Sequence, residues 1–218
     1  MKRLYFIICA LCVTTLAFAQ NKKIETFDKN SWRWTEGADK YQSVTIEEGY
    51  LVIANLQNIK KASDYQNLAK SFARLPYRPN ESFRLTIKYI VPNYNDAVYH
   101  ILFNTEKKCL MDDEETGEFD SYLLSMDGPE WVLNLDDAGL KNDKLPGKVK
   151  QKGEYPMTFV IEKKSKNVSI ELNGIQLYEG ELPMTNPCIG FMVPLNDKKT
   201  SYLKIDEVII EQADSNDD

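Results

Sequence analysis

The sequence predicts an all-β protein in which antiparallel strands form two packed sheets. Apolar and polar residues alternate over many short runs, which is the pattern of half-buried strands, and helical periodicity is almost absent. At least ten such runs occur within about 190 residues, and short turns join nearly all of them. Antiparallel strands in this number must stack or close to hide their edges, so a β-sandwich is expected.

The first expected hairpin joins residues 43–46 to residues 50–54 through a turn at Glu47-Glu48-Gly49. The next segment, residues 56–73, is ambiguous, because its polar side chains could line the wet face of a short helix. No helix is expected in the rest of the mature chain.

Residues 83–90 carry the clearest strand pattern in the chain. The apolar members of this pattern point to one face and are Phe83, Leu85, Ile87 and Tyr89. A shift of one residue in register would expose all of them, so the register of this strand is firmly specified. Residues 97–103 are apolar on both faces, which is typical of a central strand.

The second half of the chain continues the same pattern. Asp127-Gly128 and Asn173-Gly174 predict tight turns, and Asn-Gly is the strongest short hairpin signal. Residues 136–152 are rich in glycine, proline and charge, so we expect a surface loop there. The remaining expected strands are residues 122–126, 131–135, 157–162, 168–172, 175–178, 188–193 and 202–210.

The N-terminus has the three parts of a secretory signal peptide. Lys2 and Arg3 form a charged start, residues 4–16 form an apolar run, and Ala17-Phe18-Ala19 supplies a small-x-small cleavage pattern. The apolar run of about 13 residues would reach roughly 20 Å as a helix, too short for a bilayer core of about 30 Å. We therefore expect residues 1–19 to be removed as a signal peptide.

Cleavage would leave a single domain over residues 20–212 and an acidic, disordered tail at residues 213–218. The protein would be exported, to the periplasm or the extracellular space. The whole chain has 33 acidic and 27 basic residues, and loss of Lys2 and Arg3 leaves 25 basic residues and a net charge of −8. This acidic balance argues against nucleic-acid partners and anionic membranes, and no second apolar stretch is long enough to span a bilayer.

Cys109 and Cys188 are the two cysteines that would remain after cleavage, because Cys9 and Cys12 lie in the signal peptide. Both are beside strand-like segments, and exported compartments allow disulfides to persist. The sequence gives no distance between them, so a disulfide and two separate thiols are both open.

Four segments occur in an informative order along the chain. They are Phe27-Asp28 followed by Trp32, a hairpin at 48–53, a strand–turn–strand at 159–174, and closing strands at 188–192 and 205–210. In this order they resemble the concanavalin A-like lectin/glucanase superfamily, and within it the laminin-G-like and family-16-glycoside-hydrolase-like modules that bacteria secrete. The resemblance covers most of residues 24–212, and it implies a jelly-roll β-sandwich whose concave face often binds glycans.

The resemblance also raises the question of catalysis. Retaining glucanases of this fold use Glu-x-Asp-x-x-Glu, in which alternation places two carboxylates on one face, about 5 to 5.5 Å apart. The nearest match is Glu118-Phe119-Asp120, but the third carboxylate is missing and the pair ends an acidic loop that begins at Asp112. We therefore expect a solvated loop, with a calcium-binding loop as the alternative, and assign no catalytic residue.

His100 is the only histidine, which limits other catalytic schemes. Serine-type and cysteine-type triads need a histidine base, no Gly-x-Ser-x-Gly motif is present, and a zinc site needs several His or Cys ligands. The default role of His100 on a central strand is a hydrogen-bonded sheet residue.

Aromatic and polar residues on the expected central strands are the better candidates for a ligand site. Sugar rings present apolar faces that flat side chains bury, while polar neighbours bind the hydroxyl groups. The candidate ligand-binding residues are Tyr99, His100, Tyr122, Trp131 and Asn134. Core packing is the alternative role for each aromatic residue.

Asp28 and Asp206 are candidates for a structural calcium site shared by the first and last strands, as in some carbohydrate-binding sandwiches that the chain resembles. The alternative is that each carboxylate caps a turn or accepts backbone hydrogen bonds.

The leading prediction is a secreted, non-catalytic, lectin-like module that binds a poly- or oligosaccharide. The first alternative is a glycoside hydrolase or related sugar-processing hydrolase, in which carboxylates such as Asp120 and Asp136 would converge in a groove. The second alternative is an extracellular protein-interaction or structural domain, which a flat, exposed apolar patch would indicate.

Overall fold

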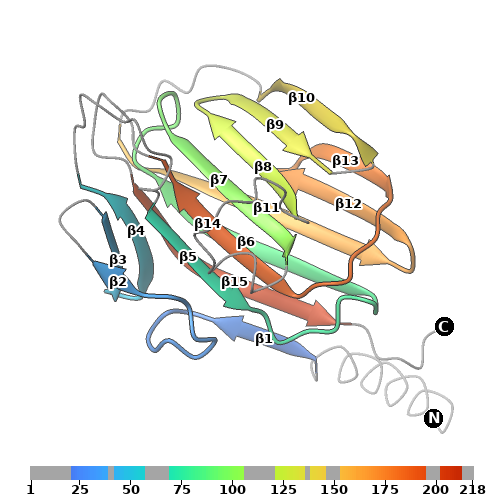
Figure 1. The fold of residues 1–218 in the computed structure, drawn as a ribbon, viewed down its shortest axis with the longest axis horizontal. Helices are drawn as coiled ribbons and strands as arrows, with labels where there is room; N and C mark the ends of the chain where they lie inside the picture. The colour runs from blue at the N-terminus through green and yellow to red at the C-terminus, as the bar shows by residue number, and fades with distance from the viewer. Residues whose placement is uncertain are drawn as a thin grey trace, which may run out of the picture.

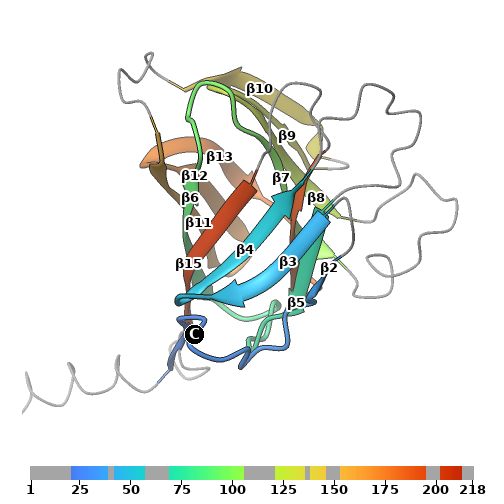
Figure 2. The ribbon, with the colours of Figure 1, turned by 90° about the vertical axis from the view of Figure 1, so that its left-hand side faces the viewer.

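The computed structural model describes residues 21–38, 42–56, 69–105, 121–135, 138–145, 153–194 and 202–212. These residues form two antiparallel β-sheets that pack face to face, with the six-stranded sheet in front in Figure 1 and on the right in Figure 2. The prediction of an all-β jelly-roll sandwich with two packed sheets is confirmed.

The six-stranded sheet has the strand order β10-β9-β8-β7-β14-β5. Its strands are β5 (Ala69–Arg74), β7 (Val98–Thr105), β8 (Tyr122–Asp127), β9 (Glu130–Asn134), β10 (Leu140–Lys144) and β14 (Cys188–Val193). β14 lies between β5 and β7 and pairs with both. Both strands are far from β14 in the sequence, so the middle of the sheet depends on long-range pairing.

The nine-stranded sheet has the strand order β13-β12-β11-β6-β15-β4-β3-β2, and β1 also pairs with β15. Its strands are β1 (Lys22–Glu25), β2 (Gly37–Ala38), β3 (Gln42–Glu47), β4 (Tyr50–Asn55), β6 (Phe83–Val91), β11 (Tyr155–Lys164), β12 (Asn167–Leu172), β13 (Ile175–Glu181) and β15 (Tyr202–Gln212). β6 and β15 form its centre.

The core lies between the sheets and is filled by the inward side chains of both. β6 follows the predicted register, because Phe83, Leu85, Ile87 and Tyr89 are all buried while the residues between them are not. Phe159 on β11 and Phe103 on β7 bring their rings to 5.7 Å across the two sheets.

The structure adds two strands where the sequence did not predict them. The ambiguous segment 56–73 ends in strand β5, which begins at Ala69; residues 57–68 lie outside the described residues. The expected surface loop 136–152 contains strand β10, whose residues are all exposed. An edge strand with one neighbour needs no buried side chain, so β10 has no apolar alternation to reveal it.

The segment that follows Trp34 closes one side of the sandwich by connecting the two sheets. The Thr35 amide donates to the carbonyl oxygen of Phe72 at 3.1 Å, and the Thr35 hydroxyl accepts from the Phe72 amide at 2.8 Å. These bonds occupy the edge of β5 in one sheet, and two residues later β2 begins and pairs with β3 in the other. The same short segment therefore protects two sheet edges.

Asn104 holds the crossover that carries the chain from β13 to β14. Its φ is positive, at 54°, a backbone conformation that asparagine tolerates well. Asn104 also interrupts the regular pairing of β7 with β14. Its amide donates to the carbonyl oxygen of Pro183 at 3.2 Å, and its side-chain oxygen accepts from the amides of Thr185 and Asn186 at 2.7 and 2.9 Å.

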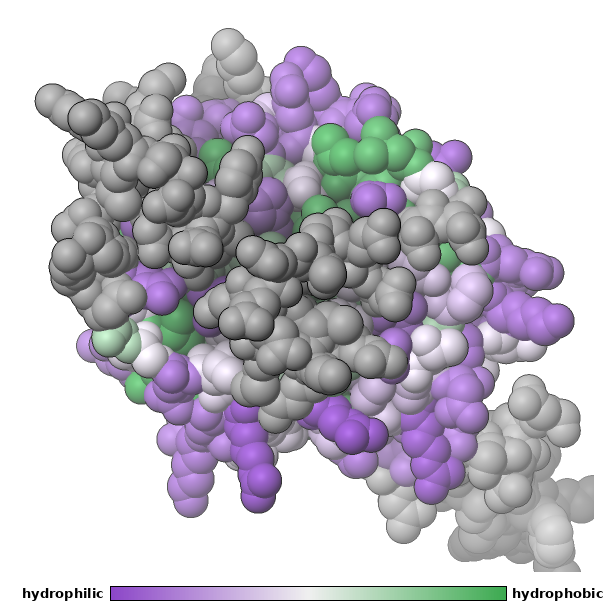
Figure 3. All heavy atoms as spheres, in the orientation of Figure 1, coloured by the Kyte–Doolittle hydropathy of each residue, from purple (hydrophilic) through white to green (hydrophobic). Residues whose placement is uncertain are grey.

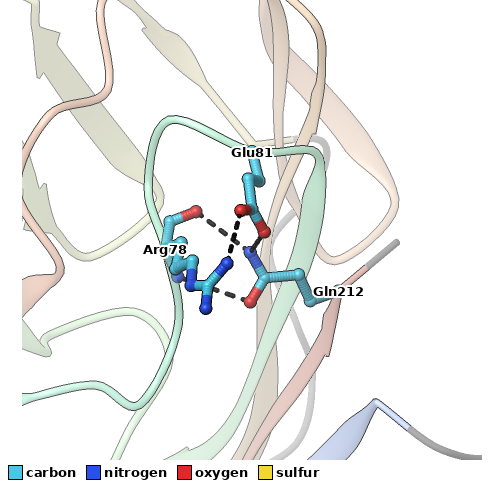
Figure 4. Close-up of polar contacts among 3 residues, drawn as sticks. All are labelled: Arg78, Glu81 and Gln212. Carbon is cyan, nitrogen blue, oxygen red and sulfur yellow. Dashed lines mark hydrogen bonds and ion pairs between the residues drawn. The ribbon is translucent and has the colours of Figure 1, made fainter. Parts of the chain in front are cut away.

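Gln212 fastens the end of β15 to the turn between β5 and β6 (Figure 4). Its side-chain amide donates to the carbonyl oxygen of Arg78 at 3.2 Å and to the carboxylate of Glu81 at 2.8 Å. The Arg78 guanidinium completes the set with a 2.9 Å bond to Glu81. The Gln212 backbone amide also donates to the Asn21 carbonyl oxygen at 3.3 Å, so the first and last described residues meet at one end of the sandwich.

A small second layer of apolar side chains lies on the outer face of the six-stranded sheet, which is the side turned away from the core. Phe72, Leu102 and Cys188 form a separate buried cluster there. The Phe72 ring occupies the space where Gly190 has no side chain, because a Cβ on Gly190 would lie 1.9 Å from the ring.

We expect Gly190→Ala to destabilise the fold by roughly 1–3 kcal/mol, the usual cost of overpacking, because the new methyl group would displace the Phe72 ring. Chemical denaturation of the purified variant measures the loss. Gly37→Ala is the matched control, since a Cβ on Gly37 meets no atom within 4 Å. Equal stability of the two variants would show that the ring of Phe72 is free to move aside.

Candidate functional site

The five predicted ligand residues lie on three adjacent strands of the six-stranded sheet, β7, β8 and β9. Side chains alternate between the two faces of a strand, and this alternation separates the five into two groups. Tyr99, Tyr122 and Trp131 face the core and are 2, 7 and 7 % exposed, whereas His100 and Asn134 face outward. The structure therefore does not bring all five together.

Tyr99 is held deep in the sandwich by a second tyrosine. Its hydroxyl lies 2.8 Å from the hydroxyl of Tyr89, and the two rings meet edge to face at 5.6 Å. Burial raises the pKa of both hydroxyls, so both remain neutral at physiological pH. Tyr122 is similarly occupied, because its hydroxyl donates to the Pro183 carbonyl oxygen at 2.6 Å. These residues have the packing role that was the alternative for each aromatic candidate.

His100 is at the centre of the outer face. Its Nδ1 lies 3.0 Å from the hydroxyl of Ser125, which is directly opposite on β8. Partial burial lowers the pKa of the His100 imidazole below its usual value of 6.5, because desolvation disfavours the charged ring. At neutral pH His100 is therefore an uncharged ring that can both donate and accept hydrogen bonds.

Strand pairing extends His100 and Ser125 into a row across the sheet. Met192 on β14 is opposite His100, and Val132 on β9 is opposite Ser125. Asn134, which is exposed, belongs to the next row, opposite Leu123 on β8. Polar groups thus lie in the middle of the face with aliphatic side chains around them.

Part of this aliphatic surface is open to solvent. Val132 and Leu140 are 37 and 59 % exposed, and Leu123 and Met192 are partly buried against the Phe72 cluster. Figure 3 shows an apolar area over β9 and β10, bordered by hydrophilic residues. None of these four aliphatic residues was among the ligand residues predicted from the sequence. The alternation of side chains along β8 and β9 could have identified two of them, because it places Leu123 and Val132 on the face opposite Trp131.

A hydrolytic site on this face would need a pair of carboxylates, and the candidates for that pair are not among the described residues. Glu118, Asp120 and Asp136 lie outside those residues. At the β8–β9 hairpin, Glu130 is 2.6 Å from the ammonium of Lys144 on β10, an exposed ion pair at the rim of the face.

The calcium expectation at Asp28 and Asp206 stays a prediction. The Asp28 carboxylate accepts a hydrogen bond from the Thr26 hydroxyl at 3.0 Å. Asp206 is exposed where β15 shifts its register against β6. Across the described ranges, no group of three or more His, Cys, Asp or Glu residues is arranged to hold a metal ion.

The disulfide expectation also stays a prediction. Cys188 is buried on the outer side of β14, and Cys109 lies outside the described residues. Residues 1–20 and 213–218, which include the expected signal peptide and tail, lie outside them as well. In the part of the chain that is described, no helix is long and apolar enough to cross a membrane.

Comparison with known proteins gives a consistent architecture but no family. No family model matches the chain, and no curated protein matches it. Among solved structures, a protein of unknown function with a galectin-like fold from Bacillus subtilis is 13 % identical with a TM-score of 0.58, and the match covers 87 % of this chain and 94 % of that one.

Two glucanases show the same likeness. The β-glucanase of Bacillus licheniformis is 14 % identical with a TM-score of 0.58, over 88 % of this chain and 98 % of that one. A non-specific endo-β-1,3(4)-glucanase from family GH16 is 11 % identical with a TM-score of 0.55, over 87 and 93 %. At these identities the likeness concerns the fold, which is the jelly-roll sandwich of galectin-like and glucanase structures.

The lowered pKa of His100 predicts a pH-dependent stability. The unfolded chain binds a proton below about pH 6.5, while folded His100 resists protonation until a lower pH. The free energy of unfolding should therefore fall as the pH drops from 6.5 through the folded pKa, and this contribution should be constant above 6.5. Urea denaturation at several pH values, with His100→Gln as the comparison, measures it.

Because His100 is the only histidine, the difference between the two pH profiles isolates its contribution from that of the carboxylates. The wild-type protein should lose more stability than the variant between pH 7 and pH 5. Parallel profiles would contradict the assignment of His100 to a partly desolvated position.

Proposed function

We propose that the chain is an exported, non-catalytic carbohydrate-binding module of the concanavalin A-like superfamily. The observation that carries the proposal is the outer face of the six-stranded sheet, where His100, Ser125 and Asn134 are surrounded by aliphatic side chains. The galectin-like and glucanase structures that share the fold support it. The proposal includes a signal peptide at residues 1–19 and a single mature domain over residues 20–212.

The chemistry of this face suits a sugar. Neutral His100 and the Asn134 amide can each donate and accept hydrogen bonds, as the hydroxyl groups of a pyranose require. Val132 and Leu123 offer apolar surface to the C–H groups of the ring, and specific ligand sites combine these two kinds of group. The exposed ion pair between Glu130 and Lys144 marks the end of the candidate binding surface at the β8–β9 hairpin.

Specific observations also favour two other functions, a glycoside hydrolase and a protein-interaction domain. A glycoside hydrolase is favoured by the glucanase likeness, and it would need carboxylates from Glu118, Asp120 or Asp136. A protein-interaction domain is favoured by the exposed side chains of Val132 and Leu140, because exposed apolar patches mark partner surfaces.

We expect His100→Ala and Asn134→Ala each to weaken binding of the recognised glycan by roughly tenfold, the effect of losing about one hydrogen bond. The experiment first screens residues 20–218 against soluble poly- and oligosaccharides by affinity electrophoresis, and follows product release in the same samples. Calorimetry then gives the dissociation constants of the variants.

Thr86→Ala is the control, because Thr86 is on β6 in the opposite sheet. Unchanged affinity in both His100→Ala and Asn134→Ala would place the ligand elsewhere and overturn the site. Release of shorter products would contradict the non-catalytic role and direct attention to the carboxylates.

A further inference from the structure

The outer face of the nine-stranded sheet carries two aromatic side chains that the core does not use. Six aromatic residues of the described chain are half-buried. Four of these pack against the core and are Trp32, Tyr77, Tyr155 and Tyr178. The other two, Tyr50 and Tyr202, are not part of that packing, so the stability of the core does not explain their position.

Tyr50 and Tyr202 lie on either side of one ammonium group. Lys204 places its Nζ 5.8 Å from the centroid of the Tyr50 ring and 5.5 Å from that of Tyr202, within cation–π range of both. Tyr50 is at the start of β4, and Tyr202 and Lys204 are at the start of the neighbouring strand β15. The two strands are antiparallel, so the two rings are separated along the strand direction with Lys204 between them.

Glu154 fixes this arrangement through one carboxylate oxygen. Its Oε1 accepts from the Tyr202 hydroxyl at 2.8 Å and from the Lys204 ammonium at 2.7 Å. Both hydrogen bonds lower the pKa of Glu154, with that of Lys204 the larger cause. Burial, followed by the bond to Glu154, raises the pKa of Tyr202 to about 12. The hydroxyl, the ammonium and the carboxylate therefore keep their protonation states at physiological pH.

Apolar side chains flank Lys204 on the two neighbouring strands. Val52 on β4 and Ile90 on β6 are the cross-strand neighbours of Lys204, and both are half-buried. Lys88 and Glu207 also form an ion pair on this face, at 2.6 Å, but the pair formed by Lys204 and Glu154 is the one flanked by two tyrosine rings.

The charge of this region selects among ligands. The ammonium of Lys204 is paired with Glu154, and Glu48 lies near enough to raise the pKa of Lys204 further. One cation thus faces two carboxylates, which disfavours an anionic ligand such as a uronic acid. A neutral sugar meets no such penalty, because its hydroxyl groups need donors and acceptors rather than an unpaired charge.

We propose that Tyr50, Tyr202, Lys204 and Glu154 form a second binding site, for a neutral pyranose, on the opposite side of the sandwich from His100. The tyrosine rings offer flat apolar surface to the sugar ring, while the carboxylate and ammonium bind neighbouring hydroxyl groups. The site uses no residue of the His100 face, so binding at each of the two sites can be tested separately.

The experiment follows the tyrosine side chains directly. In residues 20–218 with His100→Ala and Asn134→Ala combined, ring signals of 13C-labelled tyrosine are recorded by NMR during titration with neutral cello-, laminari-, xylo- and manno-oligosaccharides. We expect one or more of these glycans to shift the Tyr50 and Tyr202 signals, which single Tyr→Phe variants assign. Calorimetry should show roughly tenfold weaker binding for Tyr50→Ala and for Tyr202→Ala.

Lys88→Ala is the matched control, because Lys88 forms an ion pair on the same face and its cross-strand neighbours are Thr158 and Glu207. It should leave the affinity unchanged. Circular dichroism confirms that each variant is folded, and Tyr50→Phe, which keeps the ring, should bind normally. The proposal is overturned if no neutral oligosaccharide shifts the two tyrosine signals, or if both Tyr→Ala variants bind as well as Lys88→Ala. Either result leaves the His100 face untouched, since that face is tested by its own variants.

Discussion

The alternation of side chains along each strand is the constraint on which the rest of this structure depends. Every strand that contributes to the core gives one set of side chains to the space between the sheets and the other set to an outer face. On β7 the inward set includes Tyr99, and its immediate neighbour His100 is in the outward set. The core and the candidate site are therefore both set by the same register. A shift of one residue would turn the core side chains outward and the side chains of the site inward.

The same constraint explains how far the sequence could be interpreted. β6 was predicted with its register because its outward residues are polar, so its pattern marks the core face without ambiguity. β7 is apolar on both faces, since Leu102 belongs to the Phe72 cluster on the outer face, and the pattern there could not separate Tyr99 from His100. Trp131 was misassigned as a candidate contact for a related reason: large aromatic side chains suit both cores and ligand sites.

Contacts between segments far apart in sequence were beyond prediction. Asn104 binds the crossover at residues 183–186, and Thr35 occupies the edge of β5, yet neither has a local sequence signature. Tyr50 and Tyr202 are more than 150 residues apart and come to flank Lys204 only because β15 pairs with β4. The number and order of strands can be inferred from local pattern, whereas the groups that converge on either outer face depend on which strands become neighbours.

The meeting of β1 with the end of β15 has a mechanical consequence. Lys22 pairs with Glu211 and Glu25 with Val208, so the two strands are antiparallel, with their outer ends side by side. A force that separates residues 21 and 212 would act across these strands and break their hydrogen bonds one after another. Strands loaded along their length must instead lose many bonds at once. The domain should therefore yield at low force when pulled from these two points, with β1 detaching first and the jelly roll behind it still closed.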